Sequence, residues 1–347
     1  MSGSSCDGVD VWVTHSQNCS QELQAKTYDY PDALKGKLIG LLKGPFSYNE
    51  LICVEREYTQ FLLAVLKPLV EQFAPISLIG IHGHTVSHDP ISDFGSSKQL
   101  LQPVILAEEL GCMVVADFRQ RDIALGGQGA PLAPLYHSYR FKDHASNFAV
   151  VNIGGIANIS HIKNGNVISG YDLGPGNALM DYWVLKHFDL PYDKDGKLAA
   201  RGKVISSLLI QLKADDFIKK AAPKSIHRDY FSGDWVHDLL DINYNPYDVL
   251  RTLAQFTVDI ICESIEHSQQ LILVGGGVHN RLIVDLIGKK AKPYIPEDVD
   301  FIEAQLVAWL AEMRYQNIKL DYTQVTGAKI PTWYGEIYSP SMDNVDA

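Results

Sequence analysis

Acidic residues beside glycine-rich turns are the first candidates for chemistry in this chain, because a well-placed carboxylate can act as a base or bind a metal. The segment GYDLGPGNALMD, residues 170–181, places Asp172 just before a Gly-Pro-Gly turn. Asn177 stands where a helix beginning at Ala178 would have its N-cap, which relieves Asp172 of that role. Beside Gly and Pro an aspartate usually serves a turn. The residues alone leave Asp172 open between a turn residue and a base.

Three glycine-rich turns have the composition of phosphate-binding loops. They cover Gly3–Asp10, Ile153–Asn158 and Gly275–Asn280. Small residues let backbone N–H groups approach phosphate oxygens, and the hydroxyls of Ser4 and Ser5 add hydrogen bonds. One such turn is weak evidence, since tight hairpins use the same residues. Three at strand ends favour a nucleotide, although neither the dinucleotide nor the P-loop signature is present.

Two acids in the first turn suggest a metal site. Mg²⁺ bound to a nucleotide is typically held through one or two carboxylates, often by way of water, and Asp7 and Asp10 could supply them. Asp7 with Gly8 could equally form a turn, and Asp10 could face solvent.

The histidine-rich segment IHGHTVSH raises a zinc hypothesis through His82, His84 and His88. Rings two residues apart on a strand share one face. No catalytic-type Glu or Cys cluster accompanies them, so zinc is the less favoured interpretation. We expect His84 and Thr85 to hydrogen-bond a polar ligand at a strand end instead.

The segment ADFRQRDIALGGQGAPLAP gathers polar side chains beside flexible glycines. They are Asp117, Arg119, Arg121, Asp122 and Gln128. An arginine fork matches a carboxylate or a phosphate bidentately, so an anionic substrate group is one interpretation. A surface ion-pair cluster is the other, and it is the commoner case. The spacing alone does not decide between them.

The composition limits the class of protein. A length of 347 residues favours two domains, and 46% hydrophobic with 20% charged residues is ordinary for a soluble globular protein. The net charge of −11 and the lack of a Lys/Arg run disfavour nucleic acid and anionic membranes as partners. Five scattered cysteines without a CxxC pair indicate reduced thiols. No stretch reaches roughly 18 apolar residues and no signal pattern is found, so we expect a cytoplasmic protein.

Hydrophobic periodicity predicts an α/β protein in which short strands are separated by longer helices. The predicted strands are 9–17, 76–85, 112–119, 147–162 (a hairpin) and 270–276. The predicted helices are 51–73, 102–111, 178–188, 248–268 and 303–316, while 37–44 is ambiguous. We expect an N-terminal lobe over 1–145 and a C-terminal lobe over 146–347, since each half opens with a strand and a glycine-rich turn. Roughly the last 15 residues would pack back on the first lobe or be disordered.

An ordered series of motifs resembles the anhydro-N-acetylmuramic acid kinase family, from the first residues to about residue 330. The motifs are SGSSCDGVDV, HGHTV, DFRQRDIALGGQGAP, NIGGIANIS, DLGPGNALMD, GGGVHN, EAQLVAWLA and VTGA. The resemblance implies two RNase H-like lobes of the sugar kinase/actin-like fold, with ATP and Mg²⁺ in a central cleft. It also implies that water opens the 1,6-anhydro ring while O6 takes the γ-phosphate of ATP, giving N-acetylmuramic acid 6-phosphate and ADP for peptidoglycan recycling.

The same resemblance assigns roles residue by residue. Asp172 matches the general base. The implied ATP contacts are Gly3, Ser4, Ser5, Cys6, Asp7, Gly8, Val9, Asp10, Gly154, Gly155, Gly174, Gly176, Asn177, Gly275, Gly276 and Gly277. Asp7 and Asp10 would also bind Mg²⁺ through water. The implied sugar contacts are His84, Thr85, Arg119, Asp122 and Glu303. A homodimer is a further expectation from the family.

The sequence departs from the family pattern in four places, three of them substitutions and one a missing motif. Ser4 replaces Thr and keeps the hydroxyl, and His84 stands where Gln is expected. In PKSIHRDYF, Ile226 and His227 replace Thr-Gly before the arginine, and the stretch 92–111 lacks a Gly-Asp before its helix. The alternatives are a kinase for another anhydro-sugar such as levoglucosan, or a non-catalytic nucleotide-binding protein of the same fold. Retention of Asp172 argues against the second, because nucleotide binding alone does not need that base.

Overall fold

The computed structural model describes residues 1–2, 6–16, 18–90, 92, 94–222, 224–226, 230–240, 244–265 and 268–341. The chain forms two compact units. Unit 1 combines Met1–Leu132 with Glu303–Ala347, and unit 2 is Ala133–Ile302. The boundary expected at residue 145 thus lies inside unit 2. The C-terminal segment from Glu303 packs with the first part of the chain, whereas only roughly the last 15 residues were expected to pack there.

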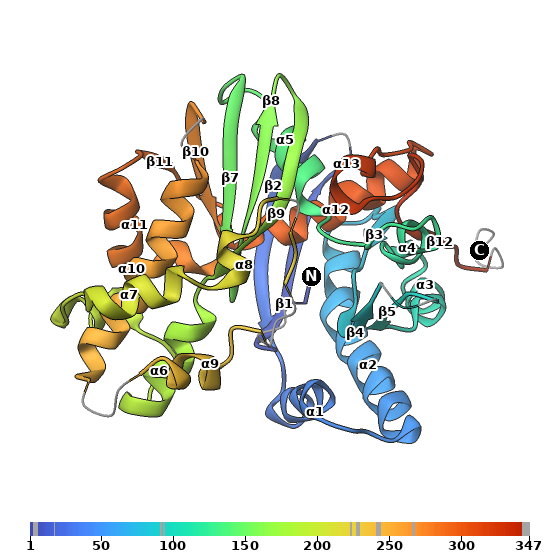
Figure 1. Ribbon diagram of the computed structural model, residues 1–347. Coiled ribbons are helices and arrows are strands. Elements are labelled where there is room, and N and C mark those ends of the chain that lie inside the picture. The colour runs from blue at the N-terminus through green and yellow to red at the C-terminus, as the bar shows by residue number, and fades with distance from the viewer. Residues whose placement is uncertain are drawn as a thin grey trace. The chain divides into compact units, whose positions relative to one another are not determined.

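Unit 2 is built on a five-stranded sheet in the order β11-β10-β7-β8-β9. The strands are β7 (Asn147–Ile153), β8 (Ile156–Lys163), β9 (Asn166–Pro175), β10 (Gln270–Val274) and β11 (Pro293–Tyr294). The first three form an antiparallel meander, and β10 and β11 run parallel to β7 (Figure 1). This order and these directions are those of the RNase H-like sheet. The hairpin expected over 147–162 is confirmed as β7 and β8.

Helices connect and cover the strands of unit 2. They are α5 (Ala133–Phe141), α6 (Ala178–Phe188), α7 (Ser206–Lys213), α8 (Asp216–Lys219), α9 (Gly233–Asp238), α10 (Pro246–Ser264) and α11 (Arg281–Gly288), with short 3-10 turns η1 (Lys194–Gly196), η2 (Ala199–Arg201), η3 (Gly276–His279) and η4 (Val299–Phe301). The long helix α10 begins at Pro246 because Asn245 caps it, with Oδ1 accepting from Tyr247 N–H over 2.9 Å. It contacts α6, α7, α11 and β9, so it organises the core of this unit.

The described strands of unit 1 fall into three small sheets. β1 (Gly8–His15) pairs with β2 (Asn18–Asp29), β4 (His84–Asp89) with β5 (Ser96–Leu100), and β6 (Met113–Ala116) lies between β3 (Leu78–Gly80) and β12 (Glu336–Tyr338). The single strand expected over 76–85 is two strands, because the chain turns at Gly83 with φ 78°.

Helices α1 (Asp32–Lys43), α2 (Tyr48–Gln72), α3 (Pro103–Leu110), α4 (Gln120–Ala124), α12 (Ile302–Tyr315) and α13 (Thr323–Thr326) complete unit 1. The ambiguous segment 37–44 is thus largely helical. Ser47 and Glu50 form a capping box at the start of α2, and α3 ends at a left-handed Gly111 as expected. Helix α12 joins this unit because Gly80 lets β3 approach it: a Cβ at Gly80 would lie 2.7 Å from Val307 O.

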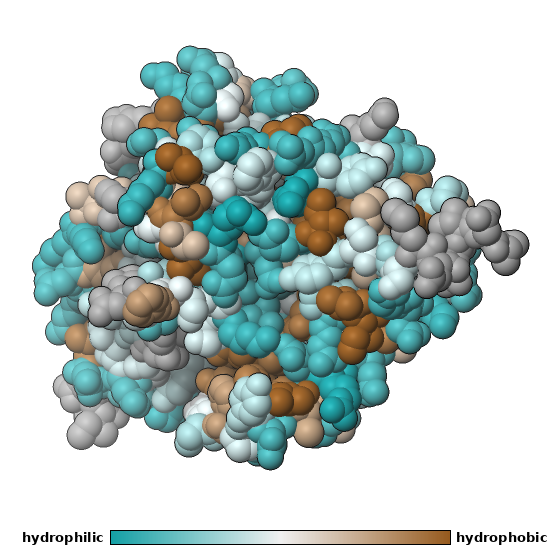
Figure 2. Space-filling model, turned by 90° about the vertical axis from the view of Figure 1, so that its right-hand side faces the viewer, coloured by the Kyte–Doolittle hydropathy of each residue, from teal (hydrophilic) through white to brown (hydrophobic). Residues whose placement is uncertain are grey.

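The surface agrees with a chain that buries its apolar residues in cores. Figure 2 shows one face, on which hydrophilic residues cover most of the area and hydrophobic residues form separate patches. Within the described ranges, no helix has both the length and the apolar character needed to cross a bilayer.

Candidate active site

Asp172 lies in strand β9 of unit 2, two residues before Gly174. Its main-chain N–H donates to Lys224 O over 3.0 Å, and its Oδ2 accepts from Ile226 N–H over 3.0 Å. The side chain is half-buried. A backbone N–H therefore fixes one carboxylate oxygen and leaves the other for a proton or a water. Asp172 is a strand residue, so the turn interpretation does not describe it.

Burial raises the pKa of Asp172, while the Ile226 N–H and the Lys224 ammonium lower it. Lys224 is itself held by Phe217 O and Ile218 O, at 3.0 and 3.1 Å from Nζ. The net effect is a carboxyl group whose proton affinity is above that of an ordinary aspartate. Such a shift suits a general base.

The second glycine-rich turn, residues 153–158, contacts the segment that follows Asp172. Gly176 N–H donates to Gly155 O over 2.9 Å, and Asn177 N–H donates to Gly154 O over 2.8 Å. A Cβ at Gly176 would lie only 2.2 Å from Gly154 O, so this close approach requires glycine. Two of the predicted nucleotide-binding segments therefore form one continuous backbone surface.

The third glycine segment joins the same surface. It follows β10, and Gly275 adopts φ 83° beside Asn152 at the end of β7. A Cβ at Gly277 would lie 2.2 Å from Ile153 Cγ2, whereas one at Gly276 would meet nothing within 4 Å. The structure thus brings together all the unit 2 residues that the resemblance assigned to ATP, since Gly174 also lies in β9.

Asn177 is the N-cap residue of α6, as expected, but its side chain does not cap the helix. Its Nδ2 donates instead to Ile153 O over 3.2 Å. The amide thus ties the helix start to the end of β7. This leaves the N-terminus of α6, an 11-residue helix, without a side-chain cap. The helix begins at the surface formed by the segments around Gly154, Gly176 and Gly276, called the glycine surface below.

The first glycine-rich turn, residues 3–10, is only partly described, because Gly3, Ser4 and Ser5 lie outside the described residues. Cys6 is buried, and Val9 is buried in β1. Gly8 faces Tyr28 so closely that a Cβ would lie 2.4 Å from its carbonyl oxygen. Asp7 is exposed and forms an ion pair with Lys35 at 2.8 Å.

Asp10 and Glu303 lie near the α-amino group of Met1 in unit 1. The ammonium donates to Asp10 O over 2.6 Å, and Thr27 Oγ1 donates to Asp10 Oδ1 over 2.6 Å. Glu303 is exposed, yet its pKa is raised. Desolvation by the surrounding protein and the charge of Asp10 raise this pKa, whereas the Met1 ammonium and Arg119 lower it. In the described part of the chain, no group of three or more His, Cys, Asp or Glu side chains is arranged to hold a metal.

Arg119, the residue before α4, is partly buried and oriented by two hydrogen bonds. Its Nε–H donates to His82 Nε2 over 3.0 Å, and its Nη1–H donates to Gly129 O over 2.6 Å. Among the described residues, no carboxylate forms an ion pair with it within 4.0 Å. This argues against the surface ion-pair interpretation for Arg119. Arg121, by contrast, does pair with Glu336.

Asp122 is fully buried and its carboxylate is occupied by the chain itself. Oδ2 accepts from Gly129 N–H over 2.7 Å, and Oδ1 accepts from Thr326 Oγ1 over 2.8 Å and from the Tyr334 hydroxyl. These bonds give Asp122 a structural role in holding Gly129, the residue whose carbonyl accepts from Arg119. They leave the carboxylate little capacity for direct contact with a sugar.

The two remaining sugar candidates begin strand β4. His84 is buried, with Nδ1 2.8 Å from Ser2 Oγ and Nε2 3.7 Å from Cys6 Sγ. The side chain of Thr85 accepts from Gln99 Nε2 over 3.2 Å. His84 thus connects β4 to Ser2, just before the first glycine-rich turn, and to Cys6 within that turn.

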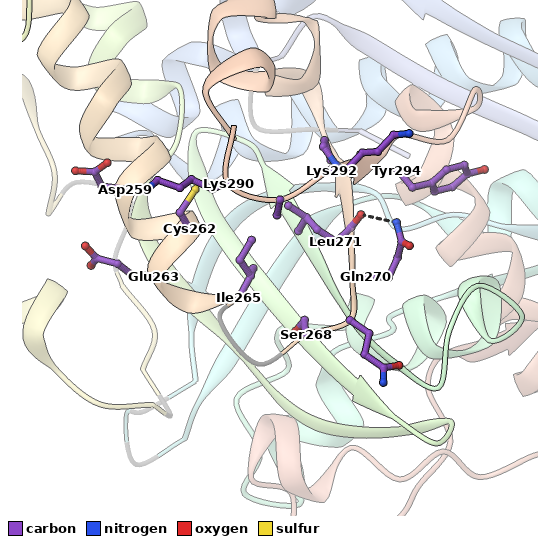
Figure 3. Close-up of a pocket in the computed structure, with 13 residues that line it drawn as sticks. Asp259, Cys262, Glu263, Ile265, Ser268, Gln270, Leu271, Lys290, Lys292 and Tyr294 are labelled. Atoms are coloured by element: carbon purple, nitrogen blue, oxygen red, sulfur yellow. Dashed lines mark hydrogen bonds between the residues drawn. The ribbon is translucent and has the colours of Figure 1, made fainter. Parts of the chain in front are cut away.

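A cavity of about 930 Å³ in unit 2 lies apart from these residues. Figure 3 shows Lys290 beside Asp259 and Cys262 of α10, whereas Lys292, the residue before β11, lies on the side of Tyr294. Charges of both signs line it, and it contains none of the predicted site residues.

Comparison with known proteins agrees with these motifs. The family model described as anhydro-N-acetylmuramic acid kinase matches residues 1–340. Proteins named anhydro-N-acetylmuramic acid kinase are 38% identical over 353 residues in Sulfurovum sp. (97% of each chain) and 36% identical over 354 residues in Legionella pneumophila (97% of this chain, 96% of that one). The chain belongs to the anhydro-N-acetylmuramic acid kinase family.

Two solved structures are only distantly similar. The (R)-2-hydroxyglutaryl-CoA dehydratase component A of Acidaminococcus fermentans has a TM-score of 0.37 and 13% identity, covering 53% of this chain and 68% of that one. The activator of 2-hydroxyisocaproyl-CoA dehydratase from Clostridium difficile has a TM-score of 0.37 and 15% identity, covering 54% and 67%. The assignment to the family does not depend on them.

Sequence reasoning missed several residues that support the site. Lys224 and Ile226 contact Asp172 from more than 50 positions along the chain, and Thr257 Oγ1 donates to Pro175 O and Gly176 O over 3.1 and 3.2 Å. His82 was considered only as a zinc ligand. The one available signal was that Ile226 falls in a segment that departs from the family pattern.

Proposed function

We propose that this protein is an ATP-dependent kinase that opens the 1,6-anhydro ring of 1,6-anhydro-N-acetylmuramic acid with water and phosphorylates O6. The product is N-acetylmuramic acid 6-phosphate, as peptidoglycan recycling requires. The observation that carries the proposal is the half-buried Asp172 carboxylate, fixed by Ile226 N–H, in the strand whose end leads into the segment that contacts Gly154 and Gly155. Membership of the family supplies the substrate class.

Asp172 acts as the general base in this mechanism. It takes a proton from a water molecule whose oxygen bonds to the anomeric carbon as the bond from that carbon to O6 breaks. O6 then forms a bond to the γ-phosphorus of ATP, and the bond to the departing ADP oxygen breaks. Positioning and electrostatic stabilisation supply most of the catalysis in such a transfer.

The glycine surface of unit 2 is proposed to hold the nucleotide. Gly154, Gly155 and Gly276 leave backbone without side chains on this surface, the buried Gly176 and Gly277 let the segments pack closely, and α6 begins at the same place. Backbone N–H groups and a helix N-terminus both favour phosphate. Residues 3–10 are proposed as the second contact to the phosphates.

The acids of the first loop fit a role with Mg²⁺. Asp7 is exposed, and its ion pair with Lys35 is of the weak surface kind, so it is free to exchange partners. Asp10 is close enough to Glu303 to raise that carboxyl's pKa, and a cation would relieve this repulsion. When bound, Mg²⁺ would neutralise charge on the β- and γ-phosphates. The cytoplasmic location and the homodimer remain predictions.

Arg119 is proposed to bind the lactyl carboxylate of the sugar. A guanidinium surrounded by protein without an ion-pair partner is costly, and an anionic substrate group would offset that cost. Levoglucosan lacks the lactyl group, so this role favours the muramic acid derivative over it. Equal turnover of the two sugars would contradict the proposal that the enzyme prefers the muramic acid derivative.

The test is to incubate the protein with ATP, Mg²⁺, the anhydro-sugar and ¹⁸O-labelled water. We expect one label at the anomeric hydroxyl of a 6-phosphate product, together with one equivalent of ADP. ADP without sugar phosphate would contradict coupled hydrolysis and transfer. Nucleotide binding without any turnover would favour the non-catalytic alternative.

A further inference from the structure

The guanidinium of Arg119 has one occupied side and one open side. Nε and Nη1 are bound to His82 and Gly129, at 3.0 and 2.6 Å. Nη2 makes no hydrogen bond to any residue that the structure describes. Burial lowers the pKa of Arg119 to about 10, which Glu303 and Asp122 oppose, so the group stays charged at neutral pH.

The contacts of His82 define its tautomer. The side chain is 5% exposed, and its Nδ1 lies 3.1 Å from Gly83 O, which can only accept. Nδ1 must therefore carry the proton, and Nε2 is left as an acceptor for Arg119 Nε–H. Burial, followed by the charge of Arg119, lowers the pKa of His82 to about 3, so the ring is neutral at physiological pH.

The other anchor of Arg119 is equally fixed. Gly129 adopts φ 64°, its N–H donates to the buried Asp122 carboxylate, and its carbonyl accepts from Arg119. A Cβ at Gly129 would lie 2.9 Å from the Ile123 side chain and 3.2 Å from Arg119 Cβ. Two independently held acceptors thus set the plane of the guanidinium before any ligand arrives.

We infer that His82 is a positioning residue that aims the open side of Arg119 at a substrate carboxylate and so makes the enzyme selective for acidic over neutral anhydro-sugars. The inference rests on the proposed function. A flexible arginine would lose side-chain freedom on binding an anion, whereas an arginine held by His82 and Gly129 has already lost it. This smaller entropy loss favours binding only of a substrate that carries an anion, so the orientation of Arg119 contributes to substrate specificity.

The experiment compares two sugars that differ in the lactyl group, 1,6-anhydro-N-acetylmuramic acid and 1,6-anhydro-N-acetylglucosamine. In His82→Leu we expect kcat/KM for the acidic sugar to fall about tenfold or more through KM, the scale for a hydrogen bond to a charged group. The value for the neutral sugar should change little. His82→Gln offers an amide oxygen in place of Nε2 and should restore most of the selectivity.

The matched control is His137→Leu in unit 2. His137 is also a buried neutral histidine, 3.0 Å from Ser160 Oγ, so its loss measures the general effect of removing a buried ring. We expect the ratio of the two sugars to stay at the wild-type value. If His82→Leu does not fold, Arg119→Lys keeps the charge but loses the Nε bond, and the same selective loss is expected.

The outcomes separate the inference from the function. If wild-type protein phosphorylates the acidic sugar but His82→Leu loses both sugars equally, or neither, the positioning role is wrong. Failure of His82→Gln to restore the ratio would overturn the acceptor role of Nε2. If wild-type protein phosphorylates neither sugar, the proposed function falls, and the inference with it.

Discussion

At the scale of single residues, the proposed catalysis depends on how the Asp172 carboxylate is held. Asp172 is shifted towards higher proton affinity by burial, yet a backbone N–H and a lysine keep part of its negative charge stabilised. The two influences are separate, because the N–H belongs to Ile226 and the charge to Lys224. They can therefore be tested by different substitutions.

The first prediction is that Asp172→Asn lowers kcat by about 10²- to 10⁴-fold, the usual contribution of a general base, while ATP and sugar still bind. Steady-state kinetics and ligand-induced thermal shifts measure the two properties. Asp259→Asn is the control, since Asp259 is a partly buried acid of the same unit that accepts from Gln255 and pairs with Lys213. A near-normal kcat for Asp172→Asn would remove this residue from the mechanism.

The second prediction concerns pH. The base works when ionised, so kcat/KM should rise with pH through the raised pKa of Asp172. This acid limb of the pH profile should lie at a higher pH than an ordinary aspartate would give. Lys224 lowers that pKa, so Lys224→Met should move the acid limb to higher pH. A pH profile of kcat/KM measures the shift. An unmoved limb, or one displaced to lower pH, would show that another group controls it.

At the scale of elements, the glycine segments of unit 2 pack closely because their glycines lie directly against backbone or against the Ile153 side chain. Gly276 and Gly277 are neighbours in η3 with opposite surroundings. A Cβ at Gly277 would lie 2.2 Å from Ile153 Cγ2 and 2.9 Å from Ile153 O, while a Cβ at Gly276 meets nothing within 4 Å. The packing of η3 on β7 therefore depends on only one of the two.

The third prediction is that Gly277→Ala destabilises the protein by about 1–3 kcal/mol, the usual cost of overpacking. Gly276→Ala should leave the melting temperature unchanged, which makes it a matched control one residue away. Calorimetry of both variants measures the difference. Equal melting temperatures for the two variants would mean that η3 does not pack on β7 as described.

The elements whose sequence signals are local could be predicted from the sequence. The hairpin over 147–162, the left-handed end of α3 at Gly111 and helix α12 all follow from short-range patterns. The break of the strand over 76–85 was missed, because alternation of apolar residues does not reveal that the chain must turn at Gly83. Site contacts such as Ile226 with Asp172 depend on tertiary folding and left no pattern in either segment.

At the scale of the whole molecule, the C-terminal segment belongs to unit 1 because buried polar contacts and strand pairing hold it there. β12 pairs with β6, and Ser341 N–H donates to Glu108 Oε1 over 3.0 Å. Thr326 and Tyr334 donate to Asp122 across more than 200 positions of sequence. No periodic signal could have predicted that a segment after residue 303 returns to the first unit.

The fourth prediction follows from this long-range connection. Asp122→Asn replaces one buried acceptor oxygen with an NH₂ donor that faces other donors, so we expect a loss of about 1.5–3 kcal/mol in the free energy of unfolding. Gly129 would lose its anchor, so KM for the sugar should rise as well. Denaturant unfolding and sugar kinetics measure the two effects, with the exposed Asp32→Asn as control. A rise in KM without any loss of stability would instead assign Asp122 to direct contact with the sugar, because a structural carboxylate cannot be removed from a buried network at no cost.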